Sequence, residues 1–248
     1  MITAVTTFGR SGHVTYGRQM MESFSQHWPM RDHLVVYVEE KEDVYQRPPG
    51  VFMKNLFLED PACAQFAIHN GTQDRAWRGG EYNYRFDAVR FCYKVFAFCN
   101  AIEHCDTEYC VWLDGDTVTH TRIPEYWIPS LFKTGSIVCL HRGAKPVETG
   151  FIAVRITKAT KEFFRDYRML YVNNAIFGLK EWHDGFVFRF MLEQTDIPFT
   201  NLAPPGSGHP FVNSELGKYM DHMKGDRKRL GRTPAAEAPL QQREGYWR

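Results

Sequence analysis

The chain has 248 residues and is 44% hydrophobic, which suits one globular α/β domain with or without a small appendage. Its 30 basic and 29 acidic residues give a net charge of +1, which argues neither for nor against nucleic acid as a partner. Every apolar run is interrupted by a charge within about ten residues, and this excludes a membrane-spanning helix.

The six cysteines include no Cys-x-x-Cys pair and no zinc-ligand spacing, so we expect free thiols. The chain enters a strand-like run at residue 2 without a signal-peptide pattern. Both observations favour a cytoplasmic protein, in a bacterium or in the cytosol of a phage-infected host.

Strand-like and helix-like segments alternate along the chain. Residues 2–8 form a β-rich run, residues 16–28 place apolar side chains at helical spacing, and residues 34–38 form a second buried strand. These three segments predict a βαβ unit with a right-handed crossover. Residues 46–80 are rich in Pro, Gly, Asn and charge, and are expected to form a variable insertion over the sheet, with a short helix at 61–69.

The remaining segments continue the alternation. An amphipathic helix is expected at 84–104, strands at 109–113, 136–140 and 149–154, helices at 161–171 and 186–192, and a loop at 198–214. The pattern predicts one α/β domain over residues 1–232. Residues 233–248 are polar and rich in Pro, Ala and Gln, and are expected to form a weakly ordered C-terminal tail.

Two carboxylates follow one of these strands directly. The apolar run Tyr109–Leu113 ends in Asp114-Gly115-Asp116, at the strand tip where open α/β sheets bind ligands. Gly115 allows the backbone to bend so that both carboxylates face the same ligand. Two oxygen ligands suit a Mg²⁺ or Mn²⁺ ion that phosphates of the substrate also bind. A calcium loop would need further acids after Asp116, and none follows; a plain turn is the other alternative.

A second motif lies more than one hundred residues later, His222-x-x-Gly225-x-x-Lys228. A neutral imidazole can complete the coordination of a metal such as Mn²⁺. Gly225 allows the backbone to approach a diphosphate, and Lys228 can place a point charge on it. The alternative is a basic surface loop that contains one histidine.

Together the two motifs resemble those of glycosyltransferases of the GT-A fold, and are similar to family 8, which includes glycogenin and bacterial galactosyltransferases. The resemblance spans residues 2–230 in motif order, although Arg229-Leu230 stands where the family has Pro-Trp. It implies a single Rossmann-like nucleotide-diphospho-sugar transferase domain, with a mixed central sheet flanked by helices. It also implies that Asp114, Asp116 and His222 hold Mn²⁺ or Mg²⁺ against the donor diphosphate.

The resemblance implies sugar-binding and catalytic residues as well. Glu148-Thr149-Gly150 looks like the strand that lies beside the transferred sugar, where small Thr149 and Gly150 leave room for a hexose and Glu148 accepts from its hydroxyls. The alternative is a turn that enters a core strand. Asp184 corresponds to a family aspartate that holds the acceptor or orients the sugar, although Gly185 follows it where the family has Gln; its alternative role is a helix N-cap.

Further contacts are expected around these residues. Trp182 and His183 stand next to Asp184, and Trp182 can stack on a sugar face. On the donor side, Lys94 lies 20 residues before Asp114 and resembles a basic residue that reaches the phosphates or the sugar; Arg90 and Arg85 compete for this role, and a solvated helix face is the alternative for each. The remaining expected donor contacts are Thr6, Thr7 and Phe8 for the base, and Glu39 or Glu40 for the ribose.

The implied function is transfer of a sugar from a nucleoside-diphosphate sugar, by default a UDP-hexose, to a hydroxyl acceptor with retention of configuration. If the enzyme inverts, Asp184 is the candidate base. The acceptor can be a glycan, a protein or a hydroxylated base in phage DNA, since seven basic residues between Lys218 and Arg232 can follow a phosphate backbone. Two rival functions remain open: a metal-dependent nucleotidyltransferase, for which Phe8–Gly12 faintly resembles a phosphate loop, and a non-catalytic sugar-nucleotide-binding module.

Overall fold

The computed structural model is built on a seven-stranded sheet in the order β10-β8-β9-β6-β1-β2-β3. It describes residues 1–39, 46–71, 76–78, 80–206, 208–241 and 245–247. β1 (Ile2–Phe8) pairs in parallel with β2 (His33–Val38) and with β6 (Tyr109–Leu113). The parallel pairing continues from β2 to β3 (Val51–Asn55).

The other half of the sheet reverses direction. β9 (Glu148–Arg155) is antiparallel both to β6 and to β8 (Ile137–Leu140), and β10 (Phe199–Asn201) pairs in parallel with β8 at the edge. The sheet is therefore mixed, as predicted. The carboxyl ends of β1 and β6 lie at the same edge of the sheet because these two strands are parallel.

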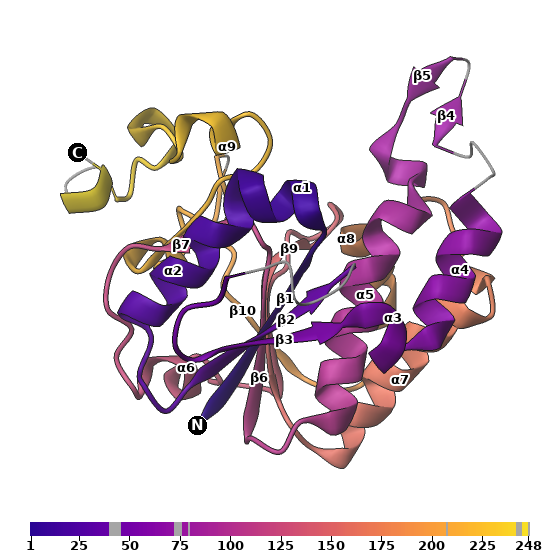
Figure 1. The fold of residues 1–248 in the computed structure, drawn as a ribbon, viewed down its shortest axis with the longest axis horizontal. Coiled ribbons are helices and arrows are strands. Elements are labelled where there is room, and N and C mark those ends of the chain that lie inside the picture. The colour runs from indigo at the N-terminus through magenta and orange to yellow at the C-terminus, as the bar shows by residue number, and fades with distance from the viewer. Residues whose placement is uncertain (40–45, 72–75, 79, 207, 242–244, 248) are drawn as a thin grey trace.

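Helices cover both faces of the sheet (Figure 1). α2 (Arg18–His27) lies on one face, whereas α4 (Pro61–Gly71), α5 (Ala88–His104) and α7 (Lys158–Val172) lie on the other. Successive side chains of a strand point to opposite faces, so β6 serves both cores. Cys110 and Trp112 pack into the core under α5 and α7, and Val111 and Leu113 pack into the core under α2.

The first helical segment starts earlier than predicted. The chain turns into α1 (Arg10–Gly12) two residues after β1, continues through a π-helical stretch from His13 to Gly17, and only then becomes α2. A π-helical stretch inside a helix often marks a functional site. Here it places Tyr16 beside the tip of β6, where a Cβ on Gly115 would lie 2.9 Å from the Tyr16 ring.

Several short strands occur where the sequence did not indicate a strand. Within residues 46–80, β3 forms a main-sheet strand in which Val51 and Met53 are buried and Phe52 is exposed, so the interpretation of this whole segment as an insertion was wrong. β10 lies inside the predicted loop 198–214. β4 (Trp77–Arg78) and β5 (Glu81–Tyr82) form a projecting hairpin.

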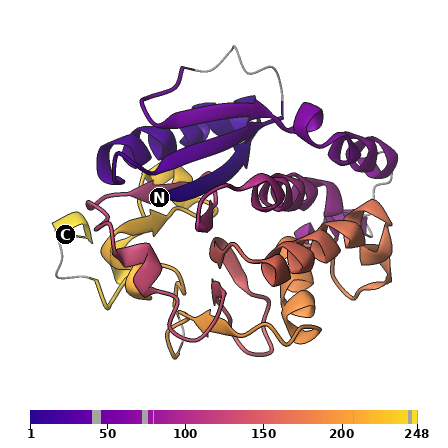
Figure 2. The ribbon, with the colours of Figure 1, turned by 90° about the horizontal axis from the view of Figure 1, so that it is seen from below.

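The described part of the predicted tail packs on the domain. Trp247 is 1% exposed and its indole nitrogen donates to the Gly217 carbonyl at 3.1 Å. The Thr233 amide donates to the Asp221 carboxylate at 2.7 Å. In Figure 2 this yellow segment lies on the side of α2, away from α5 and α7. Composition alone predicted a weakly ordered tail because the few apolar anchors, such as Trp247, are widely spaced in a polar sequence.

The remaining elements are short, apart from α8 (Asp184–Glu193). They are α3 (Leu56–Glu59), α6 (Trp127–Ser130), α9 (Arg227–Leu230), β7 (Thr117–Thr119), β11 (Met220–His222), and 3₁₀ turns at Tyr84–Phe86, Ala175–Gly178, Glu215–Lys218, Ala235–Glu237 and Gly245–Trp247. Across the described residues, every helix is too short or too polar to cross a membrane.

Candidate active site

A small two-stranded sheet brings the two sequence motifs together. β7, which follows Asp116, pairs antiparallel with β11, and the register places His222 opposite Thr117. The Met223 amide donates to the Asp116 carbonyl at 3.0 Å, which continues the pairing past the end of β11. This pairing was not predictable from the sequence, because three-residue strands are too short to show periodicity.

Asp114, Asp116 and His222 form one compact cluster. One ligand atom from each residue lies within 4.8 Å of the others. His222 Nε2 is 3.4 Å from Asp114 Oδ2 and 3.2 Å from Asp116 Oδ1, so the imidazole edge faces both carboxylates. Two carboxylates and an imidazole are a donor set that suits Mn²⁺ and related divalent cations. The arrangement fits the predicted metal site.

The charges of the cluster stabilise one another. Burial alone would disfavour the imidazolium, but Asp116 and Asp114 raise the pKa of His222 to about 10. Burial likewise opposes ionisation of Asp116, yet His222 lowers the pKa of this carboxyl to about 2. The metal-free cluster therefore carries two carboxylates and a protonated imidazole at neutral pH.

Lys94 lies beneath this cluster, between two carboxylates. Its Nζ donates to Asp114 Oδ1 at 2.7 Å and to the Thr149 carbonyl at 2.7 Å, and lies 2.8 Å from Asp184 Oδ2. The Trp112 indole also donates to Asp114 Oδ1 at 2.7 Å. Burial opposes the charge on Lys94, but Asp114 and Asp184 raise its pKa well above the usual range. Lys94 thus holds Asp114 in place from α5.

Asp184 lies in the first turn of α8, and His183 is the N-cap residue. The Asp184 carboxylate accepts from the Thr149 hydroxyl at 2.6 Å in addition to its contact with Lys94. Burial favours its protonated form, but Lys94 lowers its pKa. The structure thus joins Asp184 to the site through Lys94 and Thr149 and does not use it as a helix cap. A Cβ on Gly185 would lie 2.5 Å from the Val147 carbonyl, which explains the small residue where glutamine was expected.

Glu148 supports His222 from its far side. Glu148 Oε1 lies 3.5 Å from His222 Nδ1, and Oε2 accepts from Lys224 Nζ at 3.1 Å. Burial raises the pKa of Glu148, but Lys224 and His222 more than offset this effect and lower it. A Cβ on Gly150 would lie 2.5 Å from His222 Nδ1, so only glycine leaves room for this imidazole. Glu148 was predicted to accept from a sugar hydroxyl, and no motif indicated Lys224; in the structure the two side chains lie together.

Lys228 reaches the cluster from the opposite side. Its Nζ lies 3.0 Å from Asp116 Oδ2 and 4.6 Å from the centre of the Tyr16 ring. Tyr16 was not predictable from the sequence, because only the π-helical stretch directs it toward β6. Burial, together with Asp116, raises the pKa of Tyr16 to about 12. Gly225 has a φ of +67°, a conformation that favours glycine, and its carbonyl accepts from the Lys228 amide at 3.3 Å.

Most of the side chains that are expected to contact the donor already make contacts within the protein. The Thr7 hydroxyl donates to the Tyr37 carbonyl at 2.7 Å. Thr6 is fully buried, and Phe8 is buried against Tyr16 and Gly17. Arg90 donates to the Tyr82 hydroxyl at 3.0 Å. Of the two ribose candidates, Glu39 is half-buried at the end of β2, and Glu40 lies outside the described residues.

Two of the expected sugar contacts lie beside Asp184 and face other aromatic rings. Trp182 is buried, with Phe86 and Phe177 packed edge to face against it at 5.2 and 5.0 Å. Its ring therefore belongs to the core and does not form an exposed stacking surface. The His183 ring lies 5.6 Å from Tyr84, and its Nε2 lies 3.0 Å from Glu181 Oε2.

A further histidine approaches the cluster from the loop before β11. The His209 ring is buried, 5.9 Å from the His222 ring. Among the described residues neither of its nitrogens has a hydrogen-bond partner. Burial lowers the pKa of His209 to about 4, so it is neutral at physiological pH. No signal in this Pro- and Gly-rich stretch of sequence pointed to it.

The basic segment from Lys218 to Arg232 is largely occupied by these contacts. His222 is buried in the cluster, and Lys224 and Lys228 pair with Glu148 and Asp116. Arg227 pairs with Glu237. The segment therefore serves the site and the C-terminal packing, and offers few free charges for a DNA backbone.

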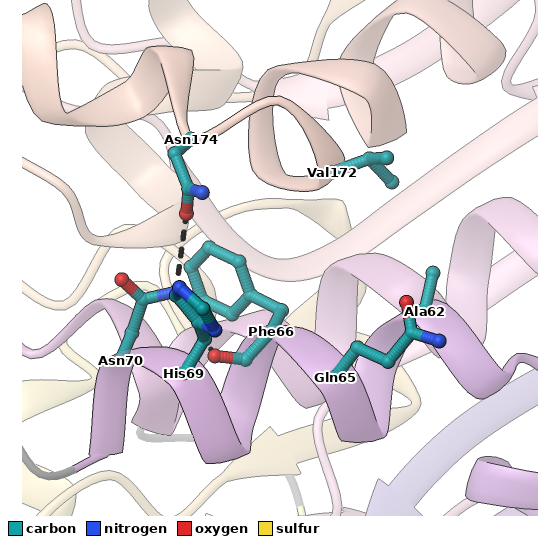
Figure 3. A pocket seen from close by; sticks show the side chains of 7 residues that line it. All are labelled: Ala62, Gln65, Phe66, His69, Asn70, Val172 and Asn174. Atoms are coloured by element: carbon teal, nitrogen blue, oxygen red, sulfur yellow. Dashed lines mark hydrogen bonds between the residues drawn. The ribbon is translucent and has the colours of Figure 1, made fainter.

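Two other features have no part in the site. The proposed phosphate loop at Phe8–Gly12 becomes helical at Arg10, and a Cβ on Gly12 would lie 2.5 Å from the Tyr16 hydroxyl. A surface pocket between α4 and the turn after α7 is shown in Figure 3; there Asn70 donates to Asn174 at 3.1 Å. None of its lining residues belongs to the cluster.

Comparison with known proteins shows the fold. No protein-family model matches the sequence, and no curated protein matches it. The structure is similar to the crystal structure of mouse xyloside xylosyltransferase 1 in its apo form, with a TM-score of 0.50 and 10% identity over 82% of this chain and 86% of that chain. This likeness confirms the predicted GT-A type α/β fold. Membership of family 8 stays a prediction.

Proposed function

We propose that this protein is a metal-dependent glycosyltransferase that moves a sugar from a nucleoside-diphosphate sugar to a hydroxyl acceptor. The observation that carries the proposal is the convergence of Asp114, Asp116 and His222 at the carboxyl ends of the sheet strands. Open α/β sheets bind ligands at this edge. The fold shared with a xylosyltransferase supports the same class.

The three cluster residues would hold Mn²⁺ or Mg²⁺. Their donor set fits either ion, and Glu148 Oε1 lies 3.5 Å from His222 Nδ1, on the side where metal-binding histidines commonly have a supporting carboxylate. When bound, the ion supplies Lewis-acid stabilisation of the charge that develops on the departing diphosphate.

Lys224 and Lys228 are the basic residues that we assign to the diphosphate. Both come from the segment after β11, and their side chains are 60% and 25% exposed. Each now neutralises a carboxylate of the site, and each has a flexible stem that can turn toward a phosphate. His209 is neutral and buried beside the cluster, and can donate one hydrogen bond to the same ligand.

We further propose that transfer retains the configuration of the sugar. An inverting reaction would need a base, and Asp184 was its candidate. Its carboxylate already accepts from Thr149, and Lys94 lowers its pKa, so it is a weak proton acceptor. In a retaining transfer the acceptor oxygen bonds to the anomeric carbon, the bond from that carbon to the diphosphate breaks, and the hydroxyl proton passes to the departing diphosphate oxygen.

A donor screen tests the proposal. The purified full chain with Mn²⁺ is incubated with UDP-glucose, UDP-galactose and UDP-xylose, and with the other common nucleotide sugars, and release of free nucleoside diphosphate is measured. We include UDP-xylose because the similar structure is that of a xylosyltransferase. We expect slow hydrolysis of one donor, and we expect it to be lost with a chelator and in Asp116→Asn.

The matched control for this screen is Asp106→Asn, which changes an exposed aspartate in the loop before β6. This variant should hydrolyse the donor at the rate of the unsubstituted protein. No hydrolysis and no thermal shift with any nucleotide sugar would contradict the proposal. Pyrophosphate release from a nucleoside triphosphate would instead identify a nucleotidyltransferase.

A further inference from the structure

Exposed aromatic side chains gather on the segment from β4 to the start of α5. Trp77 is 56% exposed, Tyr82 43% and Tyr84 49%. Only Phe52 and Tyr126 are comparably exposed aromatic residues in the described parts of the chain. An eight-residue stretch thus carries three of the five, although aromatic side chains gain free energy when they are buried. Such a concentration indicates a binding surface.

The hairpin brings two of these rings, Trp77 and Tyr82, together. Trp77 and Tyr82 are cross-strand neighbours in the β4–β5 pair, with ring centres 5.7 Å apart. The Tyr82 hydroxyl donates to Asp87 at 2.7 Å and accepts from Arg90 at 3.0 Å. A pocket lined in part by Trp77, Tyr82 and Phe86 lies beside them. These contacts orient the Trp77 and Tyr82 rings, and rings that are ordered before a ligand binds lower the entropy cost of binding.

The aromatic segment is continuous with the candidate active site. The Tyr84 ring packs on His183, the residue before Asp184, and the Trp182 amide donates to the Arg85 carbonyl at 2.7 Å. Figure 1 shows the hairpin projecting from the N-terminal end of α5, at the end of the molecule where α1 and α8 also lie. The aromatic segment therefore adjoins the residues that precede Asp184.

The chemistry of the surface favours a neutral sugar chain. One face of a pyranose ring presents C–H groups, which pack against the electron-rich face of an aromatic ring, and its edges present hydroxyls for polar neighbours. Among the residues that the structure describes here, the charges around the rings are mixed: Arg85 pairs with Glu181, and Arg90 lies against Tyr82 near Asp87. A nucleic acid would require an excess of free positive charge instead.

We propose that Trp77, Tyr82 and Tyr84 form an acceptor-binding subsite for a neutral oligosaccharide, whose chain runs from the hairpin past His183 toward the metal cluster. This inference rests on the proposed glycosyltransferase function and extends it, because it identifies the acceptor as a glycan. It assigns recognition of the acceptor chain to the hairpin, while the metal cluster recognises the donor.

Tryptophan fluorescence can test the subsite directly. The other five tryptophans of the chain are buried, so Trp77 dominates quenching by acrylamide. We would titrate the full chain with maltohexaose, cellohexaose, xylohexaose and chitohexaose in turn. One of them should protect Trp77 from acrylamide, and calorimetry should show about tenfold weaker binding of that sugar in Trp77→Ala and in Tyr84→Ala. Trp77→Phe, which keeps an aromatic ring, should retain most of the affinity.

The matched control is Tyr126→Ala, which removes an exposed aromatic ring elsewhere and should leave sugar binding unchanged. Protection by a single-stranded oligonucleotide in place of any sugar would overturn the proposal. So would an absence of protection by all four sugars in protein that hydrolyses a nucleotide sugar. Protection without turnover of any donor would support the sugar-binding surface and contradict the proposed function, so the two failures are distinguishable.

Discussion

The charged residues of the candidate active site form an inner half and an outer half, and the two halves are built differently. In the inner half, Lys94 is only 11% exposed and holds Asp114 and Asp184 at 2.7 and 2.8 Å. In the outer half, Lys224 and Lys228 approach Glu148 and Asp116 at 3.1 and 3.0 Å, from a segment after β11 that faces solvent. The inner lysine comes from the long helix α5, whereas the outer lysines come from a turn and from the four-residue α9.

This difference separates structural charges from mobile charges. An ion pair sealed under a sheet edge is costly to break, because each charge left behind is buried without a partner. An exposed lysine costs little to move, because water solvates it when it leaves. We therefore expect the inner half to fix the geometry of Asp114, and the outer half to exchange its carboxylate contacts for a metal ion and phosphates.

The largest expected effect comes from Lys94→Met. It leaves Asp184 buried without its cation and removes the nearest cation from Asp114, so the free energy of unfolding should fall by about 3–5 kcal/mol. Lys224→Met, in the outer half, should lower it by less than about 1 kcal/mol. Urea denaturation followed by circular dichroism measures both. Equal losses in the two variants would show that the halves do not differ.

The next largest effect is expected for Gly150→Ala. The new Cβ would lie 2.5 Å from His222 Nδ1, so the imidazole must leave its place between Glu148 and the aspartates. Affinity for Mn²⁺ should fall by about 100-fold, the upper range for loss of ligand support. Isothermal titration calorimetry measures this affinity. Gly178→Ala is the matched control, since a Cβ there has no neighbour within 4 Å; a similar loss in the control would contradict the steric argument.

The sequence predicted the parts of the site that are local. Asp114 and Asp116 follow a buried strand directly, and His222 lies in a recognisable motif, so adjacency in the chain carried the information. The support for these residues was not predictable in the same way. Glu148 and Lys224 meet only because the three-residue strands β7 and β11 pair, and a contact across 76 residues leaves no local pattern.

The sequence also could not distinguish buried aromatic rings from exposed ones. Trp182 looked like a sugar-stacking residue because it precedes Asp184, yet Phe86 and Phe177 enclose it. The polar segment around Trp77 did not predict a binding residue, yet Trp77 is exposed on a hairpin. Most elements of the fold were predictable because apolar periodicity marks them, but β3 and β10 were not, since they are short strands at the two edges of the sheet.

Glu148→Gln tests whether the carboxylate beside His222 supports metal binding. The amide keeps the shape of Glu148 but removes the negative charge that faces His222 Nδ1 and Lys224. Affinity for Mn²⁺ should fall by about 10-fold, the lower range for loss of a supporting carboxylate. The same calorimetric titration applies. An unchanged affinity would mean that Glu148 serves only Lys224 or a sugar hydroxyl.

The affinity for the metal ion is expected to rise with pH. The metal-free protein holds a proton on His222, whose pKa is raised to about 10, and a metal ligand must be a neutral imidazole. Binding below that pH therefore releases one proton, so affinity for Mn²⁺ should rise about tenfold per pH unit between pH 6 and 8. Titrations in two buffers with different heats of ionisation count the proton. A flat profile would show that His222 is not a ligand.

Lys228→Ala should have the smallest effect on stability and the most informative effect on binding. Lys228 lies 3.0 Å from Asp116 and is partly exposed, so its loss should change the free energy of unfolding by less than about 1 kcal/mol. Because its ammonium group competes with a cation for Asp116, the variant should bind Mn²⁺ at least as tightly as the unsubstituted protein. It should bind the nucleoside diphosphate more weakly, because a charge for the phosphates is missing. Opposite signs for the two ligands, measured by calorimetry, would establish that an outer lysine exchanges partners; weaker binding of both would place Lys228 with the fixed inner half.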